Sequence, residues 1–152
     1  LKMGRNLERA VMTTRIIVVR SGDLLPEHEE MTPFENIQWM RVLKSLKAYQ
    51  MYRRTIQERV SRPYVLKFLL KEKRFPRSFF HTLLEVKSCL KHLPRNEEAI
   101  DVLNEVGKKV LRADQAILQQ DELHRFIDEL QLGLTDIHQV IYRTYFRHIA
   151  VD

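Results

Sequence analysis

The fold is decided by the stretch DELHRFIDELQLGLTDIHQVIYRTYF, residues 121–146. Its apolar side chains recur at alternating intervals of four and three residues, which places them on one face of an α-helix. Such a near-heptad seam is typical of helices that pack against other helices in a bundle. The stretch therefore predicts a long amphipathic helix from about residue 121 to residue 148. The seam consists of Leu123, Ile127, Leu130, Leu134, Ile137 and Ile141.

The same helical periodicity, without the alternation of a strand, runs through the rest of the chain. Only 4 Gly and 5 Pro occur in 152 residues, and charged residues make up 30%, a mixture that favours helix over strand. A chain of this length fits one domain with a sizeable core. We predict a single all-α domain over residues 1–152, a bundle of about six helices. The expected helices span residues 2–20, 32–54, 61–74, 75–93, 96–117 and 121–148.

Local signals mark several of the helix starts. Thr32-Pro33-Phe34-Glu35 has the form of a capping box, and Asn96 followed by two Glu predicts an N-cap. Pro76 suits the first turn of the helix over residues 75–93. Free backbone N–H groups in that turn, together with Arg77 and Ser78, would hold a phosphate or a carboxylate. An ordinary helix start without a ligand is the alternative.

Charge is distributed unevenly along a chain whose net charge is +6. Residues 41–77 hold twelve Lys or Arg and two Glu, whereas residues 95–136 hold ten Asp or Glu and five Lys or Arg. The basic stretch also contains interleaved aromatic residues, which makes nucleic-acid binding one hypothesis. Because those aromatics mostly fall at core spacing and no known binding motif occurs, we expect a solvated basic face instead.

The single cysteine, Cys89, excludes an internal disulfide and a cysteine-based metal site. A reducing compartment, the cytoplasm, is expected. The aliphatic run over residues 16–19 is far too short to span a membrane, and no signal-peptide pattern occurs. The chain begins at Leu1, so we expect it to be a piece of a longer protein.

A polar stripe runs beside the apolar seam of the last predicted helix. His124 and Asp128 lie one helical turn apart and can share a hydrogen bond. Such a pair can perform general acid–base catalysis, or it can be a structural contact at the edge of the core, which we favour. Only Asp121-x-x-His124 resembles the repeated metal-binding spacing of di-iron bundles, so we expect no metal and no other cofactor. The stripe consists of His124, Asp128, Gln131, Thr135, His138 and Tyr142.

A second polar pattern lies on the first predicted helix. Glu8 and Arg9 are adjacent, so their side chains diverge by about 100° around the helix axis and form no local pair. A polar pocket is one interpretation, with Glu8 as a catalytic candidate beside His124 and Asp128. Arg5 and Arg9 are then candidates for anion binding, as are Arg77 and Ser78. Bridges between helices that fix their packing are the alternative.

Four stretches of the chain, in order, resemble the bacterial alpha-E domain family, a helical family named for a Glu-Arg motif. The resemblance implies an all-helical fold and no established activity. Full family members are about twice this length with two related halves, and this chain resembles the second half. The family also resembles accessory components of circularly permuted ATP-grasp ligases, found near transglutaminase-like proteases. The four stretches are residues 4–16, 52–54, 65–78 and 123–146.

From the residues and this resemblance, we expect a non-catalytic accessory module. Its partner would be a ligase of the ATP-grasp type or a transglutaminase-like protein, in a system for peptide synthesis or modification. The basic face, the Glu8/Arg9 region and Arg77 would supply the contacts. An enzyme using Glu8, His124 and Asp128 in a bundle cleft is one alternative, and a basic nucleic-acid binder is another. A homo-oligomer is a further expectation, and a membrane protein is not expected.

Overall fold

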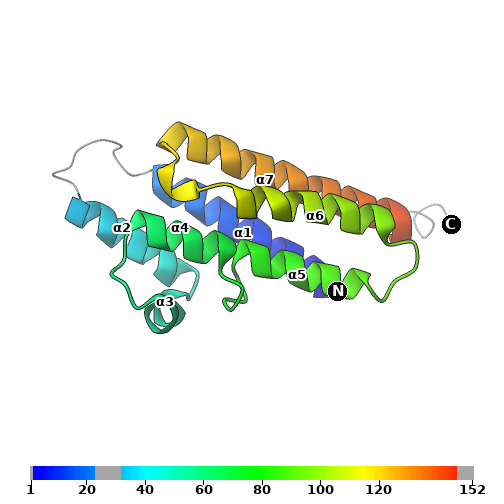
Figure 1. Ribbon diagram of the computed structural model, residues 1–152, viewed down its shortest axis with the longest axis horizontal. Coiled ribbons are helices and arrows are strands. Elements are labelled where there is room, and N and C mark those ends of the chain that lie inside the picture. Colours follow the sequence, from blue (N-terminus) through cyan, green and yellow to red (C-terminus); the bar gives the residue numbers. More distant parts are fainter. Residues whose placement is uncertain (1, 23–31, 147–152) are drawn as a thin grey trace.

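The chain folds as an all-α protein (Figure 1). The structure is a computed structural model that describes residues 2–22 and 32–146, and within these ranges it contains seven α-helices and no strand. The predicted fold class is confirmed. The α-helices are α1 (Lys2–Gly22), α2 (Thr32–Ser45), α3 (Tyr49–Ile56), α4 (Arg62–Lys71), α5 (Phe79–Leu90), α6 (Glu97–Arg112) and α7 (Gln120–Ile141). A 3₁₀ turn, η2 (Gln115–Ile117), precedes α7, and a π turn, η3 (Tyr142–Phe146), follows it.

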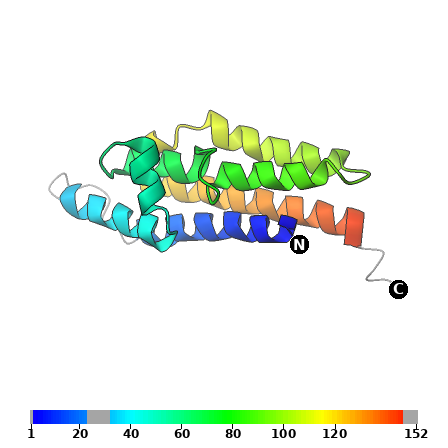
Figure 2. The same ribbon diagram turned by 90° about the horizontal axis from the view of Figure 1, so that it is seen from below.

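Four helical rods, with their axes side by side, make up the body of the bundle. They are α1, α6, α7 and a longer rod in which α4 and α5 lie end to end (Figures 1 and 2). In order around the bundle, α1 contacts α5, α5 contacts α6, α6 contacts α7, and α7 returns to α1. Each rod runs antiparallel to its neighbours (Figure 2), which is the up-and-down arrangement expected for helices joined by short connections. The two short helices α2 and α3 pack on one end of the bundle, against α1 and α4.

The core is built from the apolar stripes that the sequence predicts. Every member of the α7 seam is buried, because this face of α7 meets both α1 and α6. Aromatic rings fill the end of the bundle near α3. Phe68 makes an edge contact with Tyr52 at 5.4 Å between ring centroids and stacks on Phe75 at 4.7 Å. Burial raises the pKa of Tyr52 to about 12, and its hydroxyl donates to the Arg59 carbonyl at 2.9 Å.

The second predicted helix, residues 32–54, is broken into α2 and α3. Lys47 adopts a left-handed conformation, with φ of 54°. The Lys47 N–H donates to the Lys44 carbonyl and the Ala48 N–H to the Leu43 carbonyl, which is the hydrogen-bond pattern of a Schellman motif. Ala48 is fully buried. The continuous helix was therefore a wrong prediction, and its cause is a helix stop that uses Lys where Gly is usual.

Other predicted boundaries also differ. The helix expected to start near Pro76 begins at Phe79, with Ser78 as its N-cap. The helix expected to reach residue 117 ends at Arg112, and Ile117 is 74% exposed instead of lying on the core stripe. The Lys71 ammonium group donates to the carbonyls of Leu111, in the last turn of this helix, and of the C-cap residue Ala113.

The predicted helix starts have mixed outcomes. α2 begins at Thr32 as expected, but the side chains of residues 32–34 lie outside the described set, so the capping box stays a prediction. Asn96 occupies the N-cap of α6 without a side-chain capping bond, and its amide donates to the Leu90 carbonyl instead. None of the described helices has the length and apolar character needed to cross a membrane.

Helices α6 and α7 approach each other closely at Gly133. A Cβ atom added at Gly133 would lie 2.6 Å from Cγ2 of Val106, and Val106 is buried with a stiff β-branched side chain. We expect Gly133→Ala to lower the free energy of unfolding by about 1–3 kcal/mol through overpacking. Urea denaturation followed by circular dichroism measures this change.

Gly107 provides the matched control on α6. A Cβ atom there would lie 3.7 Å from Cε2 of Phe80, an ordinary contact, so Gly107→Ala should raise stability by about 0.5–1 kcal/mol through helix propensity. Val106→Ala in the Gly133→Ala background should recover part of the loss. Equal effects of the two glycine substitutions would contradict this packing account.

Candidate functional site

The two faces of α1 differ sharply in exposure. One face is buried in the bundle and includes Leu7, Ala10 and Ile17. The opposite face is exposed, and its residues recur mostly at intervals of three and four, as in a solvent-facing helical stripe. It carries charge together with apolar side chains that nothing in the described part of the chain covers. The exposed stripe contains Arg5, Glu8, Arg9, Met12, Arg15 and Val19.

A polar contact between α1 and α7 shows how the two helices are aligned. The amide of Gln131 donates to the hydroxyl of Thr14 at 3.3 Å. The same hydroxyl donates to the Val11 carbonyl of its own helix at 2.7 Å, so its orientation is fixed. Because the two helices run antiparallel (Figure 2), the first half of α1 lies beside the second half of α7. Glu8 of α1 therefore lies beside the second half of the polar stripe of α7, which contains Thr135 and His138.

A groove with a volume of about 590 Å³ lies between α1 and α7. Its apolar side is formed by the buried Leu7 and Leu134, the half-buried Val11 and Ile16, and the exposed Met12. Its polar lining comes from Glu8 and Arg15 on α1 and from Thr135 and His138 on α7. An open apolar surface with a few polar groups along its edges is the usual composition of a binding site.

Three polar side chains of the groove are available for contacts. No hydrogen bond or ion pair within residues 2–22 and 32–146 engages the side chains of Glu8, Arg15 or His138. Glu8 and Arg15 lie seven residues apart on one face of α1, so their Cα atoms are about 10 Å apart along the helix axis. One edge of the groove therefore carries a negative charge near one end and a positive charge near the other.

Glu8 does not share a site with His124 or Asp128. From the level of the Gln131–Thr14 contact, Glu8 lies six residues toward one end of the bundle and His124 seven residues toward the other. At 1.5 Å per residue, this separates them by about 20 Å along the helix axes. His124 is half-buried with its Nε2 3.3 Å from Nε2 of Gln120, and Asp128 is exposed. The predicted catalytic combination is not brought together.

The predicted anion-binding arginines of α1 lie outside the groove. Arg5 and Arg9 are exposed, and neither lines the groove beside Glu8. Within the described residues, no group of three or more His, Cys, Asp and Glu side chains is arranged to hold a metal ion.

Arg77 and Ser78 lie in the connection between α4 and α5, where their polar groups bind backbone carbonyls. The Arg77 guanidinium donates to the Leu46 carbonyl at the end of α2 at 2.9 Å. The Ser78 hydroxyl donates to the Glu72 carbonyl at 2.5 Å and accepts the His81 N–H at 3.1 Å. Thr13 of α1 donates to the Arg77 carbonyl at 2.9 Å. These contacts join α1, α2, α4 and α5, and they engage the Ser78 hydroxyl and one N–H group of Arg77; anion binding at these two residues stays a prediction.

Sequence reasoning missed Arg15, Thr135 and His138 as site residues. Thr135 and His138 belong to the predicted polar stripe of α7, so the stripe itself was identified. The choice of residues within it depends on the register of α1 against α7. The rule that neighbouring helices with short connections run antiparallel would have paired Glu8 with the end of the stripe, near His138, instead of its start.

A comparison with protein-family models supports the resemblance found in the sequence. The model named Alpha-E, described as a predicted alpha-helical domain with a conserved ER motif, matches residues 1–146. Glu-Arg occurs twice in the chain, as Glu8-Arg9 on α1 and as Glu58-Arg59 before α4. No curated protein and no solved structure gives a match.

The connection between α4 and α5 gives a direct test of the role of Ser78. We expect Ser78→Ala to lower the free energy of unfolding by about 1–2 kcal/mol, because α5 loses its N-cap. Ser88→Ala, at an exposed position of the same helix, should change it by less than about 0.5 kcal/mol. Thermal denaturation compares the two variants, and an unchanged melting temperature for Ser78→Ala would contradict the structural role.

Proposed function

The chain belongs to the Alpha-E family, and we propose that it is a non-catalytic module that binds a helix of a partner enzyme in the groove between α1 and α7. The observation that carries this proposal is the exposed apolar surface of the groove. The Met12 side chain is 57% exposed, although Met12 lies in the middle of α1 and lines the groove. An exposed apolar strip bordered by polar groups is characteristic of a protein-binding surface.

The dimensions of the groove suit a short amphipathic helix. The lining of α1 extends from Gly4 to Ile16, which is about 18 Å or slightly more than three helical turns. A partner helix of that length presents apolar side chains at intervals of three, four and seven residues, as other helices that bind in grooves do. Leu7, Val11 and Leu134 would receive these side chains.

The two charges on the edge of the groove favour one direction of the bound helix. The positive end of the helix dipole is stabilised by a carboxylate, and the negative end is stabilised by a guanidinium. A helix whose N-terminus lies near Glu8 and whose C-terminus lies near Arg15 satisfies both. The partner helix then runs parallel to α1, and charge complementarity of this kind contributes to specificity and to the association rate.

The separation of Glu8 from His124 favours binding over catalysis. General acid–base chemistry needs both groups within hydrogen-bond reach of the substrate or one water away. A separation of about 20 Å along the helix axes is well beyond that reach. The groove itself contains one carboxylate and one imidazole, on a surface whose lining is mainly apolar.

We assign the partner class from the family resemblance. The partner is a ligase of the circularly permuted ATP-grasp type, with a transglutaminase-like protein as the second candidate. The module would serve as an accessory component of a peptide-synthesising or peptide-modifying system.

A charge placed in the groove should prevent this association. We expect Met12→Glu to abolish retention of the cognate ATP-grasp ligase in a pull-down at moderate salt, because a buried unpaired carboxylate carries a large desolvation cost. Leu132→Glu is the control, since Leu132 is 66% exposed on α7 but does not line the groove. The control should retain the ligase as the unmodified protein does.

The outcomes distinguish the site from the partner. Retention of the ligase by Met12→Glu at the level of the unmodified protein would contradict the groove as the binding site. Failure of the unmodified protein to retain the ligase, with retention of the transglutaminase-like protein, would contradict the assigned partner class. Failure with both would contradict the proposed function.

A further inference from the structure

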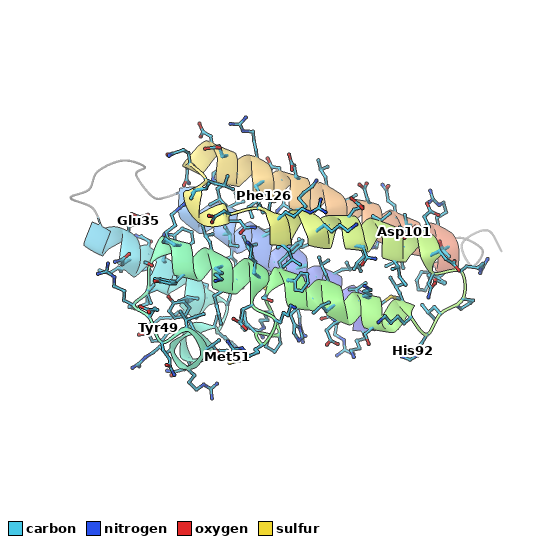
Figure 3. The ribbon with its side chains drawn as sticks, viewed as in Figure 1. Glu35, Tyr49, Met51, His92, Asp101 and Phe126 are labelled. Carbon is cyan, nitrogen blue, oxygen red and sulfur yellow. The ribbon has the colours of Figure 1, made fainter. Side chains whose placement is uncertain are left out.

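A second hollow lies at the corner formed by α2, α3 and the connection that follows α3. Its volume is about 350 Å³, and its apolar lining includes Ile37, Met40 and Val60. Ile37 is 49% exposed although it sits in a helix whose other face is fully buried. Figure 3 places Tyr49, which also lines the hollow, at this outer corner of the molecule. The hollow is separate from the groove between α1 and α7.

The rim of this hollow is cationic. Arg53 of α3 and Arg59 of the following connection line it, and both side chains are exposed without an ion pair in the described ranges. Arg53 lies over the Tyr49 ring, with its guanidinium carbon 5.8 Å from the ring centroid, and the Lys44 ammonium lies 5.3 Å from the same centroid. Arg41, three residues before Lys44 on α2, is also exposed. The rim also contains one carboxylate, Glu58.

The hollow is held in shape by contacts beneath it. The buried Tyr52 hydroxyl donates to the Arg59 carbonyl at 2.9 Å, which fixes the connection after α3. The Schellman motif after α2 fixes the angle between α2 and α3. A pre-formed site of this kind binds without a large ordering cost.

We propose that this corner binds an acidic peptide segment of a partner protein, with one apolar side chain of the segment inserted between Ile37, Met40 and Val60. Carboxylates on both sides of that side chain meet Arg53 and Arg59. Charge-assisted hydrogen bonds from guanidinium to carboxylate are strong and directional, and the apolar insertion supplies the burial that a purely ionic contact lacks. The segment is distinct from the helix bound by the groove, so the module can hold two elements at once.

The chemistry of the corner favours a peptide over a nucleic acid. Single-stranded nucleic acids need free aromatic faces on which bases stack, whereas Lys44 and Arg53 both lie over the Tyr49 ring. The apolar lining matches a side chain such as Leu and has no counterpart in a sugar–phosphate chain.

Fluorescence anisotropy with a labelled peptide tests this inference. The probe is acetyl-Glu-Asp-Glu-Leu-Glu-Asp-amide, and the same peptide with Ser in place of Leu tests the apolar insertion. We expect the Leu peptide to bind at least tenfold more tightly than the Ser peptide. The variant with Arg53→Gln and Arg59→Gln should weaken binding at least tenfold, and Ile37→Ser should remove the preference for Leu.

The matched control carries Arg112→Gln and Arg125→Gln, two exposed arginines on α6 and α7 that remove the same net charge elsewhere. This control should bind the Leu peptide within twofold of the unmodified protein, and circular dichroism confirms the fold of each variant. Equal weakening by the control pair, or no binding of the Leu peptide, would overturn the proposal. Tighter binding of a ten-residue oligothymidylate or of phosphatidylserine-containing vesicles, lost in the Arg53/Arg59 variant, would overturn it as well.

Discussion

The antiparallel register of α1 against α7 is the constraint on which the rest of the site depends. The packing of the buried faces of these two long helices sets this register, and the Gln131–Thr14 contact lies within it. A shift of one helical turn would place different side chains opposite Glu8, because residues on one helix face repeat about every 5.4 Å. In the observed register, Glu8, Arg15 and His138 line one apolar groove, and His124 lies at the far end of the pair.

A second constraint positions the short helices at the end of the bundle. The connection between α4 and α5 binds α1 through Thr13 and α2 through Arg77. The Arg77 guanidinium binds the Leu46 carbonyl where α2 ends, and the left-handed Lys47 turns the chain from α2 into α3. The exposed corner near Tyr49 results from that turn. The groove lies between α1 and α7, and the corner lies between α2 and α3.

The amount of this structure that the sequence predicts depends on how local each signal is. The α7 seam follows from the helical spacing of its apolar residues alone, so its buried residues were predicted correctly. The break at Lys47 was missed because a left-handed Lys has no sequence signal of its own, whereas Gly at that position would have one. The boundary of α5 was missed because Pro76 and Ser78 are both good helix starts; the N-cap is Ser78, whose hydroxyl accepts the His81 N–H. The partner of Glu8 was missed because a register between distant helices is set by packing.

The most direct test of this account measures which residue of α7 lies beside Glu8. Nitroxide labels are attached to cysteines introduced at Glu8 and His138, or at Glu8 and His124, with Cys89→Ser removing the native thiol. Continuous-wave electron paramagnetic resonance reports dipolar broadening only for labels that are close together. The account predicts strong broadening for the pair at Glu8 and His138 and little for the pair at Glu8 and His124. The opposite pattern would contradict the register, and with it the groove.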